Sequence, residues 1–157
     1  IYFVSILTIP LSLSAQSMVL DEDKVKLQCF EALASSDKQA IESSLTGVNT
    51  LSKTDSIAYT GALLMKMASV IEVPIEKLNT FKTGRNYLEE SIRISPDNVE
   101  YRMLRALIQE NAPGFLKYNQ DIEEDVAFVI KNQNQLSPTL KAKMDRIPLF
   151  NPPEIAD

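Results

Sequence analysis

The sequence predicts an all-α protein in which antiparallel helical hairpins stack on one another, with about six to seven helices in total. From Met18 onwards apolar residues recur at helical spacing, and no stretch alternates polar and apolar residues as a strand does. Prolines and capping residues divide these segments into successive helices separated by short breaks. Each helix pair then buries its apolar face only against its neighbours, as in helical repeat proteins.

The first half of the chain is predicted to hold three helices after the N-terminal segment. The first runs from Asp21 to Ala34, and a weaker second helix is capped by Ser36 and ends near Gly47. Asp55 is expected to cap the third, which runs to about residue 70. The apolar faces of the three helices carry these residues: Val25, Cys29, Phe30 and Leu33; Ile41, Leu45 and Val48; Ile57, Leu63, Leu64, Met67 and Val70.

The second half is predicted to hold four more helices. Pro74 suits the first turn of the longest, which runs to about Ile94, because its missing N–H costs nothing there. The remaining boundaries follow from caps and prolines: Asp97 with Glu100 opens a helix to about Glu110, Asp121 with Glu124 opens one to about Lys131, and Ser137-Pro138 opens the last. The helical domain is therefore expected to span residues 18–146. A Pro-rich tail over 147–157 is expected to be extended or disordered.

The N-terminal segment 1–17 is predicted to be a signal peptide. Residues 1–15 carry no charge, are shorter than the roughly 20 apolar residues of a membrane span, and are followed by polar and acidic residues. An initiator Met and a basic start are lacking, so the printed chain is expected to begin inside its signal. Cleavage is expected after Ser14 or Ser17. The protein would then be exported, periplasmic or secreted, without membrane insertion; a buried N-terminal helix or strand is the alternative.

Charge and composition disfavour several classes of partner and reaction. The chain of 157 residues has 16 basic and 21 acidic residues, a net charge of -5, which repels nucleic acid and anionic membrane surfaces. It has no His, which removes the commonest general base and zinc ligand. The one cysteine, Cys29, is expected to be a buried small hydrophobe. No cofactor or metal is expected.

Residues Gly84, Leu88, Ser91 and Pro96 resemble the second half of a tetratricopeptide repeat, in which a small residue, a bulky one and a closing proline recur at these spacings. The resemblance covers about residues 55–111 and implies a right-handed array of hairpins. Gly61 lies 23 residues before Gly84, where a standard unit has about a dozen. The hairpin is therefore expected to be elongated or to carry an insertion around residues 72–77. The chain also resembles small exported bacterial proteins with repeat-like helices, which implies no activity.

Two groups of charged residues are candidate sites. Arg102 and Arg105 share one side of a helix and could grip a carboxylate or phosphate; alternatively they pair with nearby acids, namely Glu89, Glu90, Asp97 or Glu100. The acidic residues Asp121, Glu123, Glu124 and Asp125 could attract a divalent cation. However, the Gly and the ligand spacing of an EF-hand are absent, so stabilisation by the helix dipole is the expected explanation.

The connection from Gln109 to Tyr118 is the third candidate. A ligand-facing loop here would use Gln109, Asn111, Phe115 and Tyr118, because loops often carry recognition. The alternative, and the expected one, is that Phe115 and Leu116 plug the end of the helical stack. Together with Arg102 and Arg105, these four residues form the predicted partner-binding set.

We consider three functions. The first, and the expected one, is a non-enzymatic protein-binding or scaffolding module of the cell envelope that binds a protein or peptide. The second is an accessory subunit permanently buried in a larger complex. The third is a carboxylate-based hydrolase, since two acids can act without His; neighbouring acids such as Glu89 and Glu90 point to different helix faces, which disfavours it.

Overall fold

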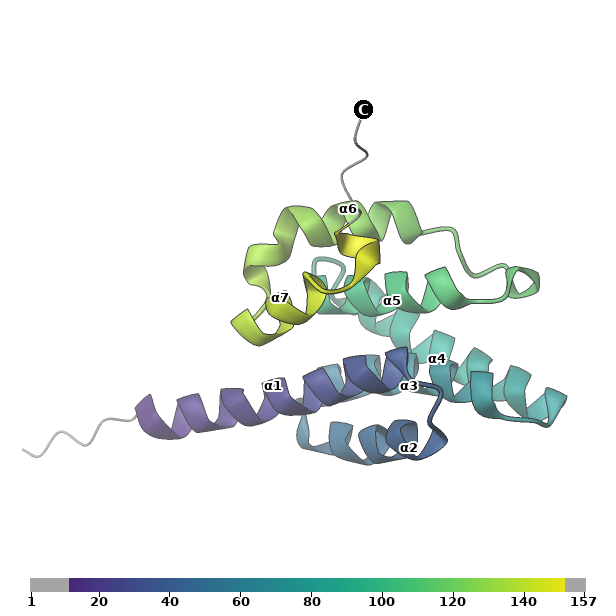
Figure 1. Cartoon of the computed structure of the whole chain (residues 1–157), viewed down its shortest axis with the longest axis horizontal. Coiled ribbons are helices and arrows are strands. Elements are labelled where there is room, and N and C mark those ends of the chain that lie inside the picture. The colour runs from purple at the N-terminus through teal and green to yellow at the C-terminus, as the bar shows by residue number, and fades with distance from the viewer. Residues whose placement is uncertain (1–11, 152–157) are drawn as a thin grey trace, which may run out of the picture.

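The computed structural model describes the backbone of residues 12–151 and the side chains of residues 21–151. Within this range the chain is all-α, as predicted, and its seven α-helices lie in two tiers (Figure 1). The lower tier holds α1 (Ser12–Ala34), α2 (Lys38–Gly47) and α3 (Lys53–Val70), and α4 (Pro74–Ile94) runs from the lower tier up to the start of α5. The upper tier holds α5 (Val99–Asn111), α6 (Ile122–Asn132) and α7 (Pro138–Met144). Four short 3-10 turns complete it: η1 (Val48–Thr50), η2 (Gly114–Leu116), η3 (Gln133–Gln135) and η4 (Pro148–Phe150).

Helix α3 is the centre of the packing. Its contact with α4 is the most extensive between any two helices, and it also packs against α1, α2 and α5. The α5–α6 pair has the next most extensive contact, so adjacent helices do form packed pairs. Helix α7 returns to pack against α1. Among the described helices, none is both long enough and apolar enough to cross a membrane.

Helices α3 and α4 form a long hairpin whose connection is only residues 71–73. The hairpin is thus elongated, and the alternative of an insertion at residues 72–77 is wrong because Pro74 already starts α4. Gly61 and Gly84 lie about three turns on either side of this connection and meet where the helices touch. A Cβ atom on Gly84 would lie 2.5 Å from the carbonyl oxygen of Gly61. The backbones can approach this closely only because both residues lack a side chain.

Four helices begin at polar caps, and three of these caps differ from the predicted ones. Asp37, Ser52 and Asn98 cap α2, α3 and α5, in place of Ser36, Asp55 and Asp97. In each case a second capping residue lies within a few positions, and the backbone conformation decides which one accepts the hydrogen bond. Ser137 caps α7 as predicted.

Both ends of the domain differ from expectation. Helix α1 begins at Ser12, inside the predicted signal peptide, and not at Asp21; residues 1–11 lie outside the described range. The start of the tail is neither extended nor disordered, because Pro148 opens the turn η4 and Phe150 is only 4% exposed. This turn packs on α6, so burial of one aromatic side chain orders it. Residues 152–157 lie outside the described range.

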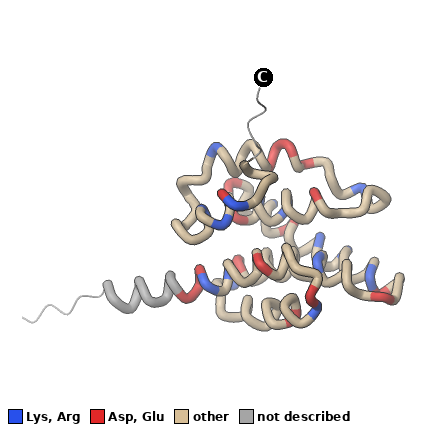
Figure 2. The backbone as a smooth tube through the Cα atoms, in the orientation of Figure 1, with Lys and Arg blue, Asp and Glu red and all other residues tan. Residues whose placement is uncertain are grey.

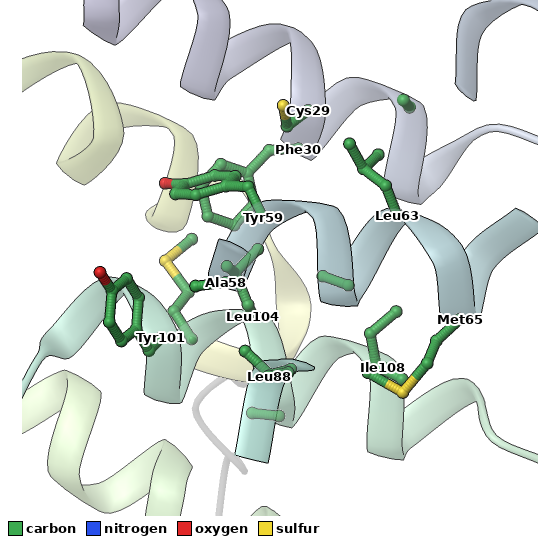
Figure 3. Close-up of a cluster of buried hydrophobic side chains, with 14 of the residues drawn as sticks. Cys29, Phe30, Ala58, Tyr59, Leu63, Met65, Leu88, Tyr101, Leu104 and Ile108 are labelled. Carbon is green, nitrogen blue, oxygen red and sulfur yellow. The ribbon is translucent and has the colours of Figure 1, made fainter. Parts of the chain in front are cut away.

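The hydrophobic core lies where the helices of the lower tier meet α5 (Figure 3). Phe30 of α1 and Tyr59 of α3 pack edge to face, with ring centroids 5.9 Å apart. Leu88 of α4 and Leu104 of α5 are fully buried beside them. Cys29 is also buried, as predicted, and burial raises the pKa of its thiol to about 12.

Candidate functional site

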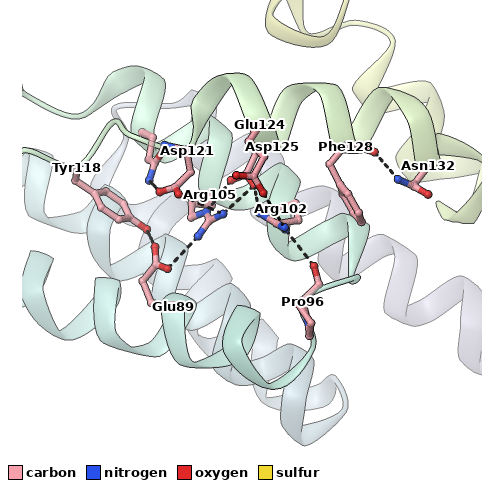
Figure 4. A network of polar contacts seen from close by, with 11 residues as sticks. Glu89, Pro96, Arg102, Arg105, Tyr118, Asp121, Glu124, Asp125, Phe128 and Asn132 are labelled. Atoms are coloured by element: carbon pink, nitrogen blue, oxygen red, sulfur yellow. Dashed lines mark hydrogen bonds and ion pairs between the residues drawn. The ribbon is translucent and has the colours of Figure 1, made fainter.

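A buried network of charged side chains joins α5 to α6 (Figure 4). Arg105 binds Asp125 with two hydrogen bonds: Nε donates to Oδ2 at 2.6 Å and Nη2 to Oδ1 at 2.9 Å. Arg102 donates from Nη1 to the same carboxylate, at 2.6 Å. The Asp125 side chain has no exposed surface. Because the two guanidinium groups neutralise and saturate it, this carboxylate is a structural anchor between the helices.

The same network extends to α4 and to the connection between α5 and α6. Glu89 accepts hydrogen bonds from Arg105 Nη1 at 3.0 Å and from the Tyr118 hydroxyl at 2.5 Å. Gln109 donates to the Asp121 carboxylate at 2.9 Å and accepts from the Asp121 backbone N–H at 3.0 Å. Asp121 occupies the N-cap position of α6, yet its side chain makes no capping hydrogen bond.

Four of the six predicted partner-binding residues therefore serve the fold. Arg102, Arg105, Gln109 and Tyr118 are held by partners within the chain. The expected pairing of arginines with acids is confirmed for Glu89, but the main acceptor is Asp125 on the next helix.

The acidic residues at the start of α6 also have structural roles. Glu123, Glu124 and Asp125 do lie in the first turn of α6, as the dipole explanation requires, but Asp125 mainly serves the two arginines. Among the described residues, no cluster of three or more His, Cys, Asp or Glu could hold a metal ion.

A second ionic cluster, which we did not predict, joins α1, α3 and α5. Lys26 Nζ lies 2.9 Å from both Asp55 and Glu100. The Tyr59 hydroxyl donates to Glu100 at 2.9 Å, and the Tyr101 hydroxyl donates to Asp55 at 2.7 Å. Burial alone would lower the pKa of Lys26, but Glu100 and Asp55 raise it above its usual value. The two acids hold a lysine between them, an arrangement that secures three helices.

The remaining two predicted residues, Asn111 and Phe115, line an open groove of about 690 Å³. The groove lies between the C-terminal end of α3, the N-terminal half of α4, the C-terminal end of α5 and the connection after α5. Most of its lining is apolar, and two lysines are included. We call this feature the groove and define it by these residues: Ser36, Met65, Lys66, Ala68, Ser69, Val70, Pro74, Lys77, Leu78, Phe81, Ile108, Asn111, Ala112, Pro113, Phe115 and Leu116.

Phe115 is the most exposed large hydrophobic residue among the described side chains, at 79%. The expectation that it plugs the helical stack is therefore wrong; only Leu116 packs against the core. Lys117 takes a left-handed conformation, with φ 48° and ψ 46°, between the exposed Phe115 and the buried Tyr118. Tyr118 packs edge to face on Phe81, with ring centroids 5.8 Å apart. This buried aromatic and the turn at Lys117 hold the connection in place, so Phe115 stands at the rim of the groove.

Comparison of the chain with protein-family models, with curated proteins and with solved structures finds no match. A mostly apolar concave site of this size, with an exposed aromatic residue in its lining, has the character of a ligand-binding site.

Proposed function

We propose that this protein is a non-enzymatic protein-binding module that holds a segment of a partner protein in the groove. The observation that carries the proposal is Phe115, a residue that is 79% exposed at the edge of an open apolar groove. Exposing an aromatic side chain to water is unfavourable, and aromatic residues are enriched among those that dominate protein–protein binding.

Neighbouring residues extend this apolar surface. Val73 and Ile75, on either side of the groove residue Pro74, are 50% and 64% exposed. Adjacent exposed apolar side chains of this kind mark interaction sites more often than isolated ones do. The contacting surface would then include the N-terminal end of α4 as well as the loop that carries Phe115.

The helix packing supports a tetratricopeptide-like arrangement as part of the proposal. Successive helices pair as α1–α2, α3–α4 and α5–α6, and the first helices of these pairs also contact one another, α1 with α3 and α3 with α5. Gly61 and Gly84 provide the close helix approach that the small residues of such repeats provide. Helical repeat arrays use their surfaces to bind other proteins.

The non-enzymatic part of the proposal rests on how the polar side chains are used. In the part of the chain that the structure describes, no buried side-chain polar atom lacks a hydrogen-bond partner. The buried Asp125 is engaged by two arginines, and the partly buried Asp55 is engaged by a lysine and a tyrosine. The cellular location we propose, the cell envelope or the exterior, rests on the apolar segment at residues 1–17 alone.

The test is site-specific photo-crosslinking followed by reconstitution. A photoreactive phenylalanine analogue replaces Phe115 in the full chain, and a second variant carries it at Ile130, which is exposed on α6 away from the groove. We expect a protein that crosslinks at position 115 and not at position 130. That protein, once purified, should bind the unmodified chain.

The affinity for that protein should then depend on the aromatic ring. Phe115→Ala should weaken it by about tenfold or more, the loss of an aromatic anchor, without changing thermal stability, since the ring is mostly exposed. Equal crosslinking at both positions, or unchanged affinity of the Phe115→Ala variant, would contradict the proposal.

A further inference from the structure

The two lysines of the groove, the half-buried Lys66 and the exposed Lys77, differ from the buried ionic clusters described above. Lys66 on α3 and Lys77 on α4 line the groove, and its lining contains no Asp or Glu. Neither lysine forms an ion pair within the described residues. Figure 2 shows acidic and basic residues interspersed along the described helices, so other parts of the molecule do bring the two signs of charge together. A chain with net charge -5 therefore has a groove lined by positive charge alone.

Burial acts to lower the pKa of both Lys26 and Lys66, but the two lysines differ in their neighbours. For Lys26 the acids Glu100 and Asp55 outweigh burial, and its pKa is raised. For Lys66 burial acts alone, and its pKa is lowered. The ammonium group of Lys66 is thus partly withdrawn from water without a carboxylate to compensate, which is unfavourable for a charge. A carboxylate brought into the groove would stabilise the charged form of Lys66, as Glu100 and Asp55 do for Lys26.

We propose that the groove binds a peptide segment in which an apolar side chain lies next to a carboxylate, with Lys66 and Lys77 pairing with that carboxylate. This inference rests on the proposed function and adds the chemistry of the partner segment. The apolar side chain would contact Leu78, Phe81 and Ile108 in the lining and Phe115 at the rim. Charge complementarity would fix the orientation of the segment and would exclude segments with basic side chains.

The experiment is a selection of short random peptides against the full chain, carried out in parallel on three variants. The first, Lys66→Gln with Lys77→Gln, removes both groove charges. The second, Lys24→Gln with Lys131→Gln, removes the same charge from exposed positions outside the groove. The third, Phe115→Ala, removes the apolar rim. Circular dichroism and thermal unfolding establish that all variants fold.

We expect the unmodified chain and the Lys24/Lys131 control to enrich peptides that carry Asp or Glu beside Leu, Ile, Met or Phe. The Lys66/Lys77 variant should keep the apolar preference and lose the acidic one. For one enriched peptide, measured by fluorescence anisotropy, affinity should fall about tenfold in the Lys66/Lys77 variant. It should fall by a similar factor when the peptide's acid is changed to its amide, and the two changes should not add.

The outcomes separate this inference from the proposed function. Enriched peptides without acids, or equal acid enrichment by the Lys66/Lys77 variant, would overturn the inference while leaving a peptide-binding groove. Absence of any enrichment sensitive to Phe115→Ala would overturn both. Binding of dodecanoate in place of peptides would assign the groove to a small amphiphile and would also overturn the inference. Acid-dependent peptide binding lost only in the Lys66/Lys77 variant would establish it.

Discussion

Asp125 shows how much a single residue contributes to this structure. Its carboxylate is inaccessible to solvent and is shared by Arg102 and Arg105, so the contact of α5 with α6 is centred on one buried anion. Removing one partner of such a group leaves the remaining charges buried and uncompensated, which costs more than the ion pair itself is worth.

We expect Asp125→Asn to lower the free energy of unfolding by about 3–5 kcal/mol. The amide has nearly the same shape but cannot neutralise two guanidinium groups. Equilibrium unfolding in urea, followed by circular dichroism, measures the difference.

The matched control is Glu124→Gln, one residue earlier in the same helix. Its side chain is 70% exposed and lies 3.3 Å from Arg102, so the loss should not exceed about 1 kcal/mol. If Asp125→Asn proved as mild as this control, the interpretation of Asp125 as a central anion would be wrong.

At this scale the sequence predicted that Arg102 and Arg105 would pair with acids but not which acid would matter most. The candidates were acids close in sequence or on the preceding helix, whereas Asp125 lies 20 residues beyond Arg105, on the next helix. Only the packing of α6 against α5 brings it to the arginines. Tyr101 and Lys26 were missed for the same reason, because their partners lie on other helices.

At the scale of elements, the α3–α4 hairpin depends on two glycines that meet between the helices. In an isolated helix Ala is more favourable than Gly by about 1 kcal/mol. Here the added methyl group at Gly84 would lie 2.8 Å from the Met65 backbone nitrogen and 2.9 Å from the Leu64 Cβ. The helices would have to separate.

Gly84→Ala is therefore expected to lower the free energy of unfolding by about 2 kcal/mol or more, despite the gain in helix propensity. The control is Gly47→Ala in α2, where the new methyl group would lie 3.7 Å from its nearest neighbour, Val25. That variant should leave stability unchanged or raise it by up to about 1 kcal/mol. Thermal unfolding of the two variants side by side makes the comparison, and a stabilising Gly84→Ala would contradict the close approach.

Most elements could be predicted because their signals are local. Pro74 and Ser137-Pro138 placed the starts of α4 and α7. Gly84, noted in the sequence as the small residue of a repeat-like pattern, lies at a close helix contact. The caps at residues 37, 52 and 98 were misplaced by a few positions because neighbouring residues cap equally well. The turn at Phe150 depends on burial against α6, which no local pattern encodes.

At the scale of the whole molecule, the dependence of stability on pH follows from one cysteine thiol and three tyrosine hydroxyls that are protonated in the folded state. Burial raises the pKa of Cys29 to about 12. Burial, with Glu100 and Asp55 or with Glu89, also raises the pKa of Tyr59, Tyr101 and Tyr118. In the unfolded chain these groups ionise near their ordinary values of 9.0 and 10.0.

Since the unfolded state then releases protons before the folded state does, stability should fall progressively as the pH rises above about 9. Lys26 acts in the same direction, because above its ordinary pKa of 10.5 the unfolded chain loses the Lys26 proton while the folded chain still holds it. Urea midpoints measured from about pH 8 to about pH 11 test this.

The Tyr101→Phe variant should show a shallower decline above about pH 10, because one titrating group is removed. A stability that stays constant or increases over this range would contradict the assignment.

The groove is the feature that the sequence could indicate only in part. Asn111 and Phe115 were recognised as candidates because they lie in the predicted connection from Gln109 to Tyr118, and loops often carry recognition. Lys66, Lys77 and Leu78 were not, since they lie inside amphipathic helices whose ends meet only in the folded chain. A surface assembled from several distant segments has no continuous pattern in the sequence.

That assembly has a thermodynamic consequence. The α3–α4 hairpin is joined by only three residues, so closing its loop costs little conformational entropy. Its surface becomes part of the groove only when α5 and the connection after α5 pack against it. An occupant of the groove therefore binds the complete native state and finds no site in partly folded chains. Its binding free energy would add to the stability of every helix that lines the groove, so the apparent stability of the folded chain would rise with the partner's concentration.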